Sequence, residues 1–333
     1  MSKRMLVLVL LCLMVVVLAV GSTTGVAQSK YTLIYASEDH ELYPPTLGIR
    51  EFARIVEEKT KGNVTVKIHL NGSLGDERAQ VESTMIGSLD LGRPALNRLV
   101  YWEKDWEVWN LPYLVTNFED GATLMKGETF TKMAQDLQKK HGVRILAVYP
   151  QGFRCVSNNR RPINAIGDLR GLKMRVSPTP LFVKTYELLG AQPVSMAFGE
   201  VFSALKQNVV DGYENDPASH VANGFMETGK YFAVTNTVFY NGLLIMNERR
   251  FQRMPKEYQT IILEAAKVAE EVVTKATIAQ TETAIQDMVD AGVTVTYPDL
   301  APFRDAVGPI YDEFRTSLSR GLVDRVLAEV DAL

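Results

Sequence analysis

The stretch from Pro255 to Asp290 most constrains the fold, because it predicts one helix that is too long for a small domain. Pro255 suits a first helical turn, no later proline interrupts the stretch, and Gly292 suits its end. One apolar stripe recurs every three or four residues, at Ile261, Ala265, Val268, Val272, Ala276 and Ala279. At 1.5 Å per residue the helix would be about 50 Å long. We therefore expect it to run along two lobes, with two shorter helices and an unmarked break as the alternative.

Strand-like and helical segments alternate before this stretch. Residues 31–36, 64–70 and 88–92 predict strands, and residues 47–60 and 76–86 predict the helices between them. Such an order predicts a largely parallel sheet with right-handed crossovers.

The same kinds of segment recur downstream, so we expect a second α/β lobe. Helices are predicted at 129–141, 180–189 and 198–207, and strands at 143–149, 153–157, 172–176 and 209–213. Residues 238–246 predict a strand that returns the chain to the first lobe. We assign residues 28–151 and about 241–275 to lobe I, and residues 152–240 and about 276–333 to lobe II.

The N-terminus predicts export. Lys3 and Arg4 precede 16 apolar or small residues from Met5 to Val20, and a small, polar segment ends at Ala27. This pattern is typical of a secretory signal peptide, residues 1–27, cleaved after Ala27. The apolar run is shorter than the 18 or so residues of most membrane-spanning helices, although an uncleaved anchor is the alternative.

Removal of 27 residues from 333 leaves 306 and changes the net charge from −3 to −5, because Lys3 and Arg4 are lost. Only Cys155 then remains, so no intramolecular disulfide can form and the core must stabilise the fold. The mild acidity disfavours nucleic acid and anionic membranes as partners. No other apolar run could span a bilayer. We expect a periplasmic or extracellular protein without stable membrane insertion.

Catalytic signatures are scarce. The four histidines are far apart, and the sequence has no H-E-x-x-H, G-x-S-x-G, G-x-G-x-x-G or P-loop motif, so we expect no metal or cofactor. Asp211, Glu214 and Asp216 form an acidic cluster that could perform acid–base chemistry, which keeps an exported enzyme as an alternative. Two lobes without a catalytic set favour a binding protein that closes on a solute.

One strand-like run, RGLKMRVSP at 170–178, carries a charge of interest. Leu172, Met174 and Val176 share one face, and Lys173 and Arg175 share the other. Arg175 is therefore either a solvent-facing charge or a fixed cation for an anionic ligand.

Several stretches, in order and spacing, resemble a known family. Weaker pieces lie at 71–75, 87–90, 111–114, 152–154 and 189–194. The most specific are DLRGLKMRV at 168–176 and AFGEVFSALKQNVVDGYEN at 197–215. Together they resemble the substrate-binding proteins of TRAP transporters, the DctP-type family, from about Tyr31 to the end of the chain.

The resemblance implies a two-lobed periplasmic binding protein fold, type II-like, with crossing strands and a long helix under both lobes. It implies a receptor, not an enzyme, that delivers a small organic acid to sodium-driven TRAP permease subunits. A binding protein for another import system is an alternative.

Three site residues follow from the resemblance. Arg175 matches the carboxylate-clamping arginine, and a guanidinium offers two parallel donors to the two oxygens of a carboxylate. Arg154 resembles a second arginine that faces the ligand, and Asn215 an amide that donates to the same carboxylate. Asp216 before Pro217 departs from the common pattern, in which Asn directly precedes Pro.

Three further positions carry open alternatives. Phe198 resembles a pocket wall, or belongs to the core. Glu38 resembles a side chain that reads the far end of the ligand, or is a surface charge. Arg93 would favour a second anionic group on the ligand, because an unpaired arginine in a dry cleft is costly, or it forms a rim or structural ion pair. Arg93 thus favours a dicarboxylate or a polyhydroxy acid.

Overall fold

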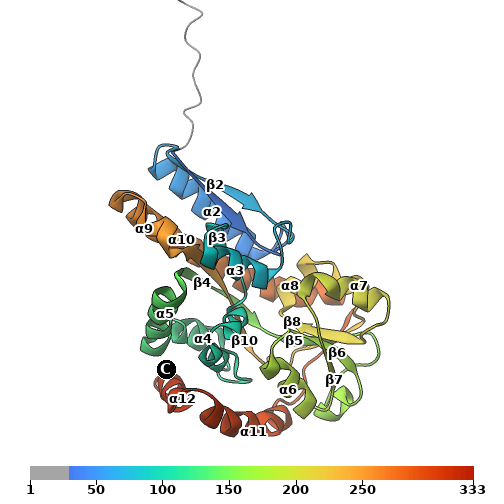
Figure 1. Cartoon of the computed structure of the whole chain (residues 1–333). Helices are drawn as coiled ribbons and strands as arrows, with labels where there is room; N and C mark the ends of the chain where they lie inside the picture. The colour runs from blue at the N-terminus through green and yellow to red at the C-terminus, as the bar shows by residue number, and fades with distance from the viewer. Residues whose placement is uncertain (1–29) are drawn as a thin grey trace, which may run out of the picture.

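The computed structural model describes residues 30–333, and the predicted signal peptide of residues 1–27 lies outside the described residues. Two mixed β-sheets with flanking helices make up the described chain (Figure 1). The predicted α/β class with two lobes is confirmed, and the parallel arrangement is confirmed only in part.

The first sheet has the strand order β2-β1-β3-β10-β4. Its strands are β1 (Tyr31–Ala36), β2 (Val64–His69), β3 (Leu91–Gly92), β4 (Val143–Phe153) and β10 (Phe239–Asn247). β1 pairs in parallel with β2 and β3, whereas β10 is antiparallel to both β3 and β4. The prediction of a largely parallel sheet is wrong at β10. Because β4 leads into the second sheet and β10 returns from it, the two strands cross the boundary in opposite directions.

The second sheet has the order β11-β9-β5-β8-β6-β7. Its strands are β5 (Cys155–Asn158), β6 (Lys173–Val176), β7 (Gln192–Ser195), β8 (Gly212–Asn215), β9 (Tyr231–Ala233) and β11 (Thr294–Thr296). β6 lies between β7 and β8 and is parallel to both, and β5 is antiparallel to β8 and β9. Arg175 therefore lies on an inner strand of this sheet.

Helices cover the sheets. On the first-sheet side they are α2 (Pro44–Lys59), α3 (Glu77–Ile86), α4 (Phe118–Leu124), α5 (Glu128–His141) and α9 (Glu248–Gln252), with 3₁₀ helices η1 (Leu96–Tyr101) and η2 (Lys104–Asn110). On the second-sheet side they are α6 (Pro180–Leu188), α7 (Val201–Lys206) and α8 (Pro217–Ala222), with short 3₁₀ turns η3 (Ile166–Leu169), η4 (Phe198–Glu200) and η5 (Phe225–Glu227). The helix predicted at 198–207 is thus a 3₁₀ turn followed by α7.

The long helix α10 (Lys256–Asp290) is unbroken, so the prediction of one helix is confirmed. Its N-terminal part buries Ala269 and Val273 in a cluster with residues of α2 and β4. Its C-terminal part contacts α8 and β11, and Met288 packs with Phe232 of the second sheet. The helix therefore joins both halves of the molecule (Figure 1).

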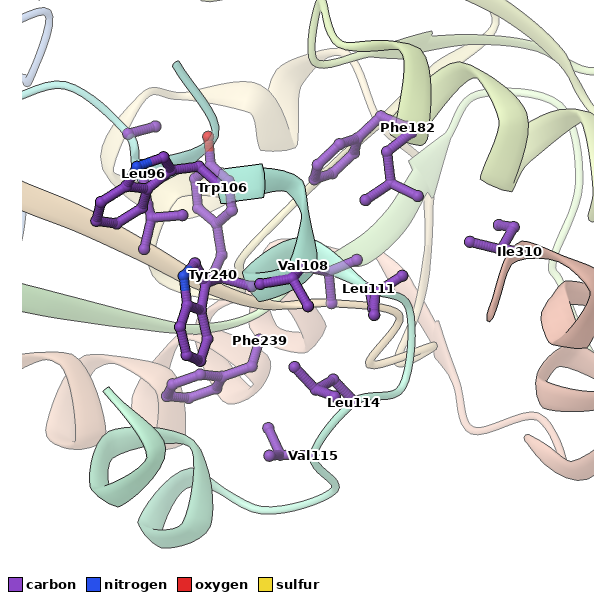
Figure 2. Packing of buried hydrophobic residues seen from close by; sticks show 14 of the residues in the cluster. Leu96, Trp106, Val108, Leu111, Leu114, Val115, Phe182, Phe239, Tyr240 and Ile310 are labelled. Carbon is purple, nitrogen blue, oxygen red and sulfur yellow. The ribbon is translucent and has the colours of Figure 1, made fainter. Parts of the chain in front are cut away.

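A large apolar cluster also crosses between the halves. Figure 2 shows Trp106 and Val108 of η2, Tyr240 of β10, Phe182 of α6 and the C-terminal residue Ile310 in this cluster. The C-terminal helices α11 (Ala301–Ser317) and α12 (Leu322–Asp331) contact α6 and α4 respectively. One C-terminal helix therefore contacts the second-sheet side and the other contacts the first-sheet side. The predicted lobe boundaries stay a prediction.

We predict that Gly48→Ala destabilises the protein. Gly48 lies where α2 crosses α10, and a Cβ there would be 2.4 Å from Cγ2 of Val273 and 3.2 Å from the carbonyl oxygen of Ala269. Overpacking of this kind costs about 1–3 kcal/mol. Urea denaturation measures the loss. Gly167→Ala is the control, because nothing lies within 4 Å of its added Cβ, and a loss of equal size there would contradict the explanation.

Candidate functional site

A cleft lies between the two sheets. It contains about 460 Å³ of unfilled space, its open mouth included. The structure brings all six predicted site residues into its lining: Glu38, Arg93, Arg154, Arg175, Phe198 and Asn215. They follow or belong to strands of both sheets, so the cleft is formed by the meeting of two strand-end surfaces.

Arg175 is buried, with 1% of its surface exposed, whereas its neighbour Lys173 is exposed. Nε and Nη2 of Arg175 donate to the carbonyl oxygen of Met196 at 3.1 and 2.9 Å. Nη1 has no hydrogen-bond partner within the described residues. The solvent-facing interpretation is therefore wrong, because β6 is buried on both faces at this position.

Arg154 is neutralised by Glu214. Its Nε donates to Oε2 of Glu214, and its Nη2 donates to the carbonyl oxygen of Glu214 at 2.7 Å. The face of Tyr240 lies 4.0 Å from Cζ of Arg154. Burial disfavours the charged guanidinium, but Glu214, together with Tyr240 and Asp216, outweighs burial and holds the pKa of Arg154 above its usual range.

Both carboxylate oxygens of Glu214 already accept hydrogen bonds from groups other than Arg175. Its Oε1 accepts a hydrogen bond from the backbone nitrogen of Ser177 at 2.9 Å and lies 3.8 Å from Nη1 of Arg175. Burial lowers the pKa of Arg175 to about 10, because Glu214 offsets only part of the lost hydration. Arg175 is therefore a fixed cation whose charge lacks a close partner.

Asn215 and Asp216 are placed by the start of α8. Nδ2 of Asn215 donates to Oγ of Ser219 at 2.7 Å. Asp216 is the N-cap of α8, accepts from the backbone nitrogen of Ser219 at 2.8 Å, and accepts from the hydroxyl of Tyr43 at 3.0 Å. Pro217 then occupies a first helical position. The departure from the common pattern at Asp216 is thus a helix cap that also joins the two sides of the cleft.

Arg93 belongs to a buried ion-pair network. Its Nη1 lies 2.8 Å from Oδ1 of Asp39 and 3.8 Å from Oε1 of Glu77. Glu77 in turn pairs with Nε of Arg98 at 2.7 Å. The charge of Arg93 is compensated by protein carboxylates, so Arg93 gives no reason to expect a second anionic group on the ligand. The structural ion pair is the better interpretation.

Glu38 and Phe198 also line the cleft. Glu38 forms no hydrogen bond or ion pair within residues 30–333, and burial, followed by the charge of Glu77, raises its pKa to about 8. The half-buried ring of Phe198 lies 5.9 Å from Cζ of Arg175 and packs edge-on against Phe225. Phe198 therefore lines the cleft as well as packing against a small cluster.

Sequence reasoning missed several residues that line the cleft, among them Tyr43, Arg98, Gln151 and Ser177. Gln151 donates to the hydroxyl of Tyr43, and Ser177 follows β6 directly. The available signal was a polar residue near the end of an apolar strand, as at Gln151 and Ser177.

The acidic cluster has structural partners. Asp211 pairs with Arg160 at 2.7 Å, Glu214 pairs with Arg154, and Asp216 caps α8. None of these three carboxylates is left for acid–base chemistry, which removes the main support for the enzyme alternative.

Two sheets joined by crossing strands, one helix shared by both, and a buried cationic cleft between them define a two-lobed solute-binding protein. Residues 35–317 match the family described as bacterial extracellular solute-binding protein, family 7. The chain belongs to this family, the DctP-type solute-binding proteins of TRAP transporters. The family is periplasmic and consists of receptors, not enzymes. Within residues 30–333, no helix is both long and apolar enough to cross a membrane.

Known proteins of similar length resemble this chain. The sialic acid-binding periplasmic protein SiaP of Vibrio cholerae is 29% identical over 83% of this chain and 86% of its own. A TRAP periplasmic solute-binding protein from Sulfitobacter with bound β-D-galacturonate has a TM-score of 0.85 at 27% identity, covering 91% of this chain and 100% of that chain. One from Chromohalobacter salexigens with bound D-glucuronate has a TM-score of 0.86 at 26% identity, covering 90% and 100%.

We predict that Glu38 makes stability depend on pH. A glutamate has a pKa of about 4.3 when solvated, whereas burial in the cleft raises the pKa of Glu38 to about 8. Its stabilising contribution is therefore fully present below the solvated pKa and is lost as the pH rises through about 8.

Calorimetric melting between about pH 6 and pH 9 tests this dependence. The melting temperature of Glu38→Gln should fall less over this pH range than that of the unaltered protein. Glu57→Gln, on the exposed face of α2, is the control and should keep the full loss. Parallel curves for Glu38→Gln and the unaltered protein would contradict the prediction.

Proposed function

We propose that this protein is an extracytoplasmic solute receptor that binds a monocarboxylate sugar acid in the cleft and delivers it to TRAP permease subunits driven by sodium. The ligand carboxylate would lie against Nη1 and Nη2 of Arg175. Asn215 and Arg154 would supply further hydrogen-bond donors. The free Nη1 of buried Arg175 is the observation that carries the proposal. A charge-assisted bond in a water-excluding cleft is strong, and closure of the lobes would exclude that water.

The balance of charge in the cleft supports a ligand with one carboxylate. Four buried arginines form ion pairs with three carboxylates. The arginines are Arg93, Arg98, Arg154 and Arg175, and the carboxylates are those of Asp39, Glu77 and Glu214. Asp216 interacts with the N-terminus of α8 and with Tyr43. Glu38, with its pKa near 8, is mainly neutral at pH 7. Arg175 is the least compensated of the four cations, because its Nη1 lies 3.8 Å from Glu214 and has no hydrogen-bond partner in the described chain, and a single carboxylate would compensate it.

The relatives support the same class. Galacturonate, glucuronate and sialic acid, named for three of them, each combine one carboxylate with several hydroxyl groups. The buried Nε and Nη2 of Arg93 have no hydrogen-bond partner within the described residues and could donate to hydroxyl groups. A dicarboxylate has no comparable support, because Arg93 is already paired with Asp39.

We predict that Arg175→Ala abolishes most of the binding. Removal of one partner of a buried charged pair costs about 2–5 kcal/mol of binding free energy. For the unaltered protein, a ligand at 100 times its dissociation constant should add about 2.7 kcal/mol of stability. Thermal shift and calorimetric titration with D-galacturonate and D-glucuronate measure both effects. Lys173→Ala, exposed on the same strand, is the control, and equal binding by the two variants would refute the role of Arg175.

We also predict export and sodium-driven delivery. The sequence of the protein recovered from the periplasm should begin at Gln28, after removal of residues 1–27, as N-terminal sequencing would show.

Uptake of a labelled sugar acid by cells that hold the receptor and its permease should require a sodium gradient. Uptake that needs ATP and no sodium would instead indicate another import system, and a start at Met1 would indicate the uncleaved anchor.

A further inference from the structure

A second hollow of about 530 Å³, its mouth included, adjoins the cleft and shares Glu38, Phe198 and Asn223 with it. Beyond these shared residues it is lined by Asn71 and Phe202, which are both exposed and so place it nearer to the solvent. We call this second hollow the outer chamber.

One wall of the outer chamber is a fixed turn on the first-sheet side. Asn71 and Gly72 have φ values of 57° and 66°, in the left-handed region. The backbone nitrogen of Asn71 donates to the carbonyl oxygen of Asp39 at 3.2 Å, and that of Gly72 donates to Ser37 at 2.9 Å. The turn is thus held against the segment that carries Glu38, and the side chain of Asn71 remains exposed.

The facing wall is aromatic and comes from the second-sheet side. Phe202 of α7 has 37% of its surface exposed, and its ring lies 6.0 Å from that of Phe225 with 31° between the planes. Asn223 also lines this wall. Its Nδ2 donates to the carbonyl oxygen of Ser219, which leaves its Oδ1 as an acceptor. An aromatic surface with a few amides suits a sugar ring, which has both C–H faces and hydroxyl groups.

The outer chamber is suited to a neutral group. No lysine or arginine is among the residues that line it in the described chain, and Nζ of Lys206, which lies 5.4 Å from the centroid of the Phe202 ring, is paired with Glu227 at 3.2 Å. Because the two walls come from opposite sides of the cleft, the chamber and the cleft would close together around one continuous ligand.

We propose that the outer chamber holds a neutral second sugar ring, so that the preferred ligand is a glycosylated sugar acid with its carboxylate at Arg175 and its second ring beyond Glu38. This inference rests on the proposed function, which places the carboxylate end. Phe202 acts here as a residue that determines specificity for the second ring.

A matched pair of acids tests the inference. Gluconate and lactobionate share the same carboxylate chain and single negative charge, and lactobionate adds one galactose ring. We expect calorimetric titration to show at least tenfold tighter binding of lactobionate, and no binding of neutral lactose. Gluconate that binds as tightly as lactobionate would overturn the inference and leave the proposed function in place. Failure of lactobionate to bind to protein that binds D-galacturonate or D-glucuronate would overturn the inference alone, and failure of all four acids to bind would overturn both.

Variants locate the effect. Phe202→Ala should weaken lactobionate about tenfold, to the affinity of gluconate, and Phe202→Tyr should restore the difference because the ring remains. Val209→Ala is the control: it is exposed, follows α7 and lines neither the cleft nor the outer chamber. A lactobionate-to-gluconate ratio that persists in Phe202→Ala would overturn the inference.

Discussion

The buried carboxylate of Glu214 governs the electrostatics of the cleft. It binds Arg154 through side chain and backbone, accepts from Ser177, and still lies 3.8 Å from Arg175. Two guanidinium groups without it would repel each other in a region that water cannot hydrate, and an unpaired buried charge is strongly destabilising. Because its own bonds are already formed, Glu214 holds Arg175 nearby without satisfying it. The result is a buried guanidinium, that of Arg175, whose charge is only partly compensated within the described residues.

Much of this architecture could be predicted from the sequence because it depends on local pattern. The unbroken helix α10 followed from periodicity and from proline and glycine at its ends. The return of the chain to the first sheet at β10 followed from an apolar run of strand length. The placement of Arg175 and Asn215 in one cleft came from the family resemblance. The alternating pattern of residues 172–176 alone could not decide whether Arg175 faces the solvent or the interior.

Other features could not be predicted because they depend on residues far apart in the chain. The partner of Arg93 is Asp39, which lies on a different segment, so the sequence could not show that the arginine was already compensated. The antiparallel direction of β10 depends on where the second sheet sits. The outer chamber joins a turn after β2 to aromatic residues more than a hundred positions later, and no motif links them.

The shared helix α10 has a mechanical consequence for any opening of the cleft. It contains neither glycine nor proline between Lys256 and Asp290, and sharp helix kinks arise mainly at such residues or where the hydrogen-bond ladder is interrupted. Separation of the lobes must therefore be absorbed as gentle bending spread over many peptide units, or as sliding where α10 meets α8 and β11. In the first case the helix would act as an elastic restraint on the amplitude of lobe separation, because bending a continuous hydrogen-bonded rod costs energy at every turn.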